Sequence, residues 1–120
     1  MGIAWYVDKE KIGRPCKNQK KQKPILILYP GLGGGHNNLY THSLAKKAMK
    51  DGYKCGVAMF RCAEGTPITS YRVTCSVSAD DGQELIDYVH SNYIVDSQTQ
   101  EKKTRLYCYG ASLGALILGR

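Results

Sequence analysis

Blocks of apolar residues alternate with mixed segments along the chain, and their lengths predict strands. The continuous apolar run Ile25–Tyr29 is typical of a strand buried on both faces, as in a parallel sheet. Residues 54–60 predict a second buried strand, and residues 104–109 predict a third. Residues 2–7 predict a short strand, because they are rich in aromatic and β-branched side chains.

Between these strands, apolar residues recur at the spacing of a helix. Asn37 or Asn38 can cap a helix, which Gly52 ends. A second helix begins at Asp80 and Asp81, whose carboxylates we interpret as caps that the helix dipole stabilises. Its apolar face carries Leu85, Ile86 and Val89. Because strands alternate with helices, we expect an α/β fold in which helices flank a mainly parallel sheet.

Composition narrows the class of protein and its setting. The 120 residues suit one domain, and 42% apolar residues can supply its core. No apolar stretch approaches the ~18–20 residues that a membrane helix needs, and no secretory signal opens the sequence. We therefore expect a cytoplasmic location for the chain as given. Five cysteines without C-x-x-C spacing predict reduced thiols and no metal cluster, with Cys55 and Cys108 packed in apolar strands.

The net charge of +7 is concentrated in one segment. Residues 8–23 contain seven basic and two acidic residues, so they carry +5 of that charge. A lysine-rich run beside proline, asparagine and glutamine is typical of a solvated basic loop, and no nucleic-acid motif accompanies it. We therefore expect no nucleic acid among the partners.

The strongest chemical motif is G-x-S-x-G at residues 110–114, between a predicted strand and a helix that begins with residues 115–118. This is the context of a nucleophile elbow, in which Ser112 sits on a sharp, strained turn. Gly110 and Gly114 would let the strand and the helix approach closely, and the N–H group after the serine would point at a developing oxyanion. The alternative is a plain glycine-rich turn.

A glycine-rich turn at residues 30–35 follows the first buried strand. Its position favours an oxyanion loop, because a serine elbow follows later in the chain. A phosphate-binding loop is the second interpretation, although His36 stands where G-x-G-x-x-G has its last glycine after Gly31 and Gly33, and a Walker lysine is absent. A plain turn is the third interpretation. We expect no cofactor.

A nucleophilic serine needs a general base, and the order of residues in this chain does not supply one. All three histidines, His36, His42 and His90, precede Ser112, whereas α/β-hydrolases place serine, acid and histidine in that order. None of residues 113–120 is Asp, Glu or His. Although His36 adjoins the glycine-rich turn, we interpret it as a polar residue near a helix start.

Together these motifs resemble the abhydrolase branch of the α/β-hydrolase superfamily, which includes YheT-like bacterial esterases and membrane-anchored lipid-ester hydrolases. Their order and spacing match the branch from about Ile3 to Arg120. The residues that carry the resemblance are Pro30-Gly31-Leu32-Gly33-Gly34, Asn38-Leu39-Tyr40, Gly52-Tyr53, Phe60-Arg61, residues 65–70, Asp80-Asp81 and the serine elbow. The chain departs from the branch at Cys62, where glycine usually follows the arginine.

The resemblance implies a serine hydrolase of lipid or short-to-medium-chain esters. Ser112 would be its nucleophile, and the backbone N–H groups of Leu32 and Leu113 would form its oxyanion hole. The triad acid and histidine would lie beyond Arg120, so we expect an incomplete α/β-hydrolase core, truncated after the elbow and nearly inactive alone. Residues 104–109 would then form an unpaired sheet edge.

The resemblance also leaves two other functions open. A longer form of the chain could associate with a membrane, since some members of the branch are anchored there. The alternative to an enzyme is a catalytically inactive short form that acts as a binding or interaction protein. A nucleotide-binding module is a more distant alternative.

Overall fold

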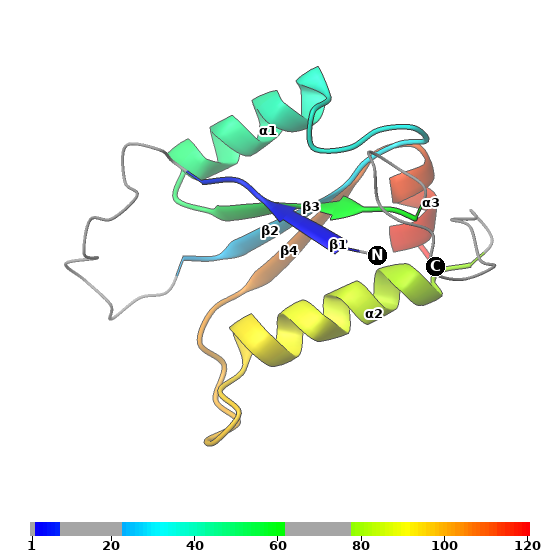
Figure 1. Cartoon of the computed structure of the whole chain (residues 1–120). Coiled ribbons are helices and arrows are strands. Elements are labelled where there is room, and N and C mark those ends of the chain that lie inside the picture. Colours follow the sequence, from blue (N-terminus) through cyan, green and yellow to red (C-terminus); the bar gives the residue numbers. More distant parts are fainter. Residues whose placement is uncertain (1, 8–22, 62–77) are drawn as a thin grey trace.

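A computed structural model describes residues 2–7, 23–61 and 78–120 (Figure 1). Its four strands are β1 (Gly2–Trp5), β2 (Ile25–Tyr29), β3 (Lys54–Met59) and β4 (Leu106–Gly110). They form one sheet in the order β1-β3-β2-β4. β2 pairs in parallel with both β3 and β4, whereas β1 pairs antiparallel with β3. The sheet is therefore mixed, with three parallel strands and one antiparallel edge strand.

In the part of the chain that the structure describes, three α-helices and one π-helical turn accompany the sheet. These are α1 (Leu39–Lys50), α2 (Asp80–Val89), the π-helical turn η2 (His90–Ile94) that continues α2, and α3 (Leu113–Leu118). Figure 1 shows α1 on one side of the sheet and α2 on the other. The α/β fold predicted from the alternation of elements is confirmed in this coarser form.

The central strand β2 is apolar throughout because both of its faces are covered. Ile25, Ile27 and Tyr29 pack with side chains of α2 and α3, whereas Leu28 packs with Ala45 of α1. This division follows from the period of two residues by which strand side chains alternate between faces. Because β3 and β4 pair with β2 on its two edges, the backbone N–H and C=O groups of β2 have hydrogen-bond partners in the sheet, and its side chains can all be apolar.

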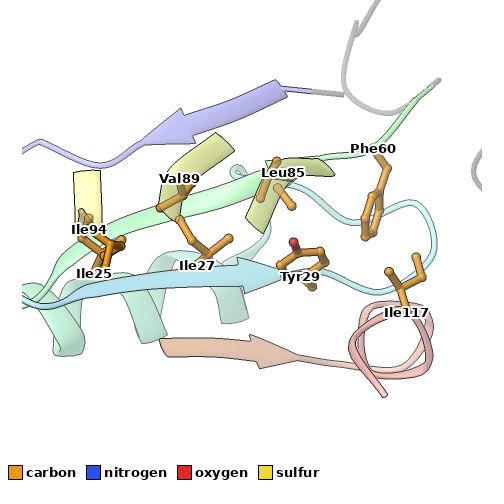
Figure 2. Close-up of a cluster of buried hydrophobic side chains, with 9 residues drawn as sticks. Ile25, Ile27, Tyr29, Phe60, Leu85, Val89, Ile94 and Ile117 are labelled. Carbon is orange, nitrogen blue, oxygen red and sulfur yellow. The ribbon is translucent and has the colours of Figure 1, made fainter. Parts of the chain in front are cut away.

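The larger core cluster extends along β2, from Ile25 and Ile94 at one end to Tyr29, Phe60 and Ile117 at the other (Figure 2). The Tyr29 ring lies 6.1 Å from the Phe60 ring, and its hydroxyl donates a 2.8 Å hydrogen bond to the Gly82 carbonyl. Burial raises the pKa of this phenol far above its usual value, so it remains a neutral donor. The bond ties the end of β2 to the first turn of α2.

The prediction that Asp80 and Asp81 cap a helix is wrong. Ala79 precedes the helix as its N-cap, and no side chain caps it. Both aspartates lie inside the first turn, where Asp81 accepts hydrogen bonds from Nε and Nη2 of Arg61, the latter at 2.9 Å. Because the guanidinium offers two parallel charge-assisted hydrogen bonds, the Asp81 carboxylate turns toward Arg61, just beyond β3, and not toward the N–H groups of its own helix.

Two further expectations also need correction. The composition of residues 91–103 predicts a polar connection, but Ile94 is 1% exposed and belongs to the core, because η2 extends α2 by one more turn over the sheet. Cys108 is exposed rather than packed, because β4 is the edge of the described sheet. Cys55 is buried, as expected, and burial raises the pKa of its thiol to about 11.

Some sequence features lie outside the described residues. They are the basic loop except Lys23, the segment 65–70 that contributed to the family resemblance, and Cys16, Cys62 and Cys75. Within the three described stretches, no helix is long and apolar enough to cross a membrane.

Candidate active site

Ser112 lies at the sharp junction between β4 and α3. Its backbone angles are φ 51° and ψ −117°, and Gln100 is the other non-glycine residue of the described chain with a positive φ. An L-residue held in such a sparsely populated region costs about 1–3 kcal/mol, and such strain is concentrated at functional sites. The predicted sharp turn is therefore present at the predicted serine.

The two glycines of the motif are explained by close contacts between backbones. A Cβ atom on Gly114 would lie 2.0 Å from the Tyr29 carbonyl oxygen, and a Cβ atom on Gly110 would lie 2.7 Å from the backbone of Ala115. Neither position has room for a side chain. The G-x-S-x-G spacing thus lets α3 start directly against the end of β2.

The glycine-rich turn after β2 reaches the same place. A Cβ atom on Gly31 would lie 3.3 Å from Cβ and 3.9 Å from Oγ of Ser112, so the turn passes directly beside the serine. The two segments meet because β2 and β4 are parallel neighbours, whose carboxyl ends lie at one edge of the sheet. A 3.1 Å hydrogen bond from the Ala111 N–H to the Tyr29 carbonyl joins them.

Two backbone donors at this junction have no hydrogen-bond partner among the described residues. The N–H groups of Leu32 and Leu113 take part in none of the hydrogen bonds found among the described residues. The Leu32 side chain is 86% exposed, so its peptide lies at the surface beside Gly31. A serine hydroxyl can attack a carbonyl carbon, and N–H groups beside it, here in the glycine-rich turn and at the first residue of α3, can hold the oxygen that becomes negative.

Two hydroxyl groups that the motifs did not indicate as site residues hold the glycine-rich turn. The Tyr40 hydroxyl accepts a 2.9 Å hydrogen bond from the Gly31 N–H, and the Thr41 hydroxyl donates a 2.7 Å bond to the Gly35 carbonyl. Both residues belong to the first turn of α1. A pair of hydroxyl residues just after a glycine-rich turn is a signal that could have indicated them.

The three histidines occupy different surroundings. The His36 carbonyl accepts a hydrogen bond from the Tyr6 hydroxyl, and the His42 ring packs edge-on against the Tyr6 ring at 5.5 Å. His90 is exposed at the start of η2, beyond α2. The structure thus associates the His36 backbone and the His42 ring with Tyr6, the residue after β1.

Among the residues that the structure describes, Asp80, Asp81, Cys55 and Cys108 form no composite metal site. Within the described stretches, no three side chains of His, Cys, Asp or Glu come together in a way that could hold a metal ion. The chemistry that this junction offers rests on a serine hydroxyl and backbone donors.

Comparison with known proteins finds relatives of low identity. Over 100 residues, or 82% of the chain, it is 28% identical to an abhydrolase domain-containing protein of Dictyostelium discoideum, of which it spans 24%. Over 98% of the chain it is 25% identical to the human phospholipase ABHD3, of which it spans 26%. Over 62% it is 29% identical to the putative esterase YheT of Escherichia coli, of which it spans 22%.

These matches cover only part of each relative. The chain spans about a quarter of the length of these three curated proteins. No protein-family model matches the chain, and no solved structure matches it with significance.

Proposed function

Because this chain resembles the abhydrolase proteins, as its motifs predicted, we propose that it carries the nucleophile and the oxyanion hole of a serine hydrolase. The substrate class is a carboxylic ester of a lipid or of a short-to-medium-chain acid, in line with relatives named phospholipase and esterase. The observation that carries the proposal is the strained backbone of Ser112 with Gly31 packed beside it.

The proposed reaction follows from these groups. The Ser112 hydroxyl attacks the ester carbonyl carbon and gives its proton to a general base, while the N–H groups of Leu32 and Leu113 hydrogen-bond the oxyanion. Collapse of the tetrahedral intermediate breaks the bond to the alcohol, which leaves with that proton. Water, deprotonated by the same base, then releases the acid from the acyl-enzyme.

The proposal assigns the base and its orienting acid to sequence that this chain does not include. Loss of these partners leaves only the catalysis that an oxyanion hole and substrate binding provide, which is small compared with that of an intact triad. We therefore expect the 120 residues alone to hydrolyse a p-nitrophenyl ester very slowly.

The test is fluorophosphonate labelling of native extract from the source cells. We expect the tag on the peptide that contains Ser112 and not on Ser91, an exposed serine that provides an internal control. A Ser112→Ala variant should lose the tag. Absence of the tag from a protein that is demonstrably present would refute the proposal and favour an inactive binding protein.

A further inference from the structure

The first turn of α1 holds the glycine-rich turn at two points. Tyr40 binds it at Gly31, whose N–H donates to the phenol oxygen at 2.9 Å, and Thr41 binds it at Gly35. Thr41 is 1% exposed, and its hydroxyl lies 2.8 Å from the Asn38 carbonyl as well. The Thr41 contacts therefore hold the part of the turn next to α1, and Tyr40 holds the part next to Ser112.

Between these points, the part of the turn at Leu32 and Gly33 is exposed, and one backbone hydrogen bond closes it. Gly34 donates a 2.9 Å hydrogen bond to the Gly31 carbonyl, which closes a tight turn over Leu32 and Gly33. Gly33 has a φ of 69°, a conformation that glycine adopts without strain, and the Leu32 side chain is exposed. Among the described residues, the exposed Leu32 side chain therefore adds little packing that could orient its peptide. Its orientation depends on the two hydrogen bonds of Gly31.

We infer that Tyr40 is a positioning residue for the oxyanion hole, an inference that rests on the proposed function. Its hydroxyl engages the Gly31 N–H, so the loop presents the next N–H, that of Leu32, to the ligand oxygen. An oxyanion donor must lie about 2.7–3.1 Å from the oxygen that it stabilises, so rotation of the Gly31 peptide would weaken this contact. Without the Tyr40 hydroxyl, Gly31 would also be free to turn its N–H toward water.

The test compares Tyr40→Phe with Tyr107→Phe in the complete natural protein. Both tyrosines are 42% exposed, but within the described residues the Tyr107 hydroxyl makes no hydrogen bond, so the control removes the same atom without the contact. We expect Tyr40→Phe to lower the rate constant kinact for fluorophosphonate labelling of Ser112 about tenfold, the size of one neutral hydrogen bond. The half-saturating probe concentration KI should change less than twofold, because ground-state binding does not use the oxyanion contact.

A second measurement separates positioning from mere stability. An alkylboronic acid forms a tetrahedral adduct with a nucleophilic serine, so its affinity should also fall about tenfold in Tyr40→Phe and stay unchanged in Tyr107→Phe. Equal kinact and equal boronate affinity in wild type and Tyr40→Phe would overturn the inference. Lack of labelling in the wild type would instead refute the proposed function, so the two failures are distinguishable.

If Tyr40→Phe does not fold, 3,5-difluorotyrosine at position 40 replaces it. This residue keeps the ring and the hydroxyl, but its oxygen is a weaker hydrogen-bond acceptor. At a pH where the phenol remains protonated, we expect kinact to fall by a smaller factor, with KI unchanged. An unaltered kinact would contradict the inference.

Discussion

Gly114 offers the sharpest test of how the candidate site is built. Replacement by alanine puts a Cβ atom 2.0 Å from the Tyr29 carbonyl oxygen and 2.7 Å from that of Pro30. Ordinary contact begins at 3.4 Å, so α3 must move away from the end of β2 by more than an ångström. Both obstacles are backbone atoms, one in the last residue of the central strand β2 and one in the residue that follows it, and neither can turn aside as a flexible side chain could.

The expected loss of unfolding free energy can be estimated from the contacts that this movement of α3 disturbs. Overpacking typically costs about 1–3 kcal/mol. Ile117, which is 5% exposed and packs on the Tyr29 side of the sheet, would lose part of a burial worth about 1.5–3 kcal/mol. Alanine favours the helix by about 1 kcal/mol relative to glycine, which offsets part of this loss of stability. We therefore expect Gly114→Ala to lower the free energy of unfolding by about 2–3 kcal/mol.

Urea unfolding followed by the fluorescence of Trp5, the single tryptophan of the chain, measures this loss. Gly2→Ala is the matched control, because the nearest atom to its new Cβ is 4.0 Å away, at ordinary contact distance. The control should change stability by less than about 0.5 kcal/mol. A Gly114→Ala chain that unfolds at the wild-type urea concentration with the same slope would refute the argument from close packing.

Three other predictions follow from the same structure. Ser112→Gly should be about 1 kcal/mol more stable than Ser112→Ala in the same urea assay, because glycine relieves the strain of φ 51°, and equal stabilities would contradict this. A double-mutant cycle on Arg61 and Asp81, both less than one quarter exposed, should give a coupling of about 1–2 kcal/mol that persists in high salt; zero coupling would show the pair to be incidental. Since burial raises the pKa of Cys55 to about 11, its contribution to stability is complete below the ordinary value of 9.0 and is lost as the pH rises toward 11. Cys55→Ala should flatten that alkaline decline, and iodoacetamide at pH 8 should modify exposed Cys108 much faster than Cys55; similar rates would count against the burial of Cys55.

Local sequence patterns predicted the strands and helices well where one physical cause dominates. Ile25–Tyr29 is a strand with the predicted bounds, because an unbroken apolar run has a single good solution, burial on both faces. The helix ended by Gly52 was also predicted, since that glycine has a φ of 97° just beyond the last turn. Predicted strand ends differ from the observed ones by one or two residues.

The predictions were wrong where the folded arrangement, and not the local sequence pattern, decides the surroundings of a residue. Asp81 fits a cap by sequence, but Arg61, twenty positions earlier, binds its carboxylate in the folded chain. Cys108 lies in an apolar run, yet its strand is an edge of the described sheet, and only the strand order decides that. Ile94 follows a polar segment, and its burial depends on the continuation of α2 as η2.

By itself, the sequence determined which residues could carry chemistry here: a serine flanked by glycines after a strand, and a glycine-rich turn after another. Tertiary structure alone decided that they meet. Parallel pairing of β2 with β4 brings Gly31 to Ser112 across eighty residues, and Gly114 closes against the Tyr29 carbonyl. The physical reason is that backbone angles and apolar periodicity are local properties, whereas strand order and close packing depend on the contacts of the whole chain.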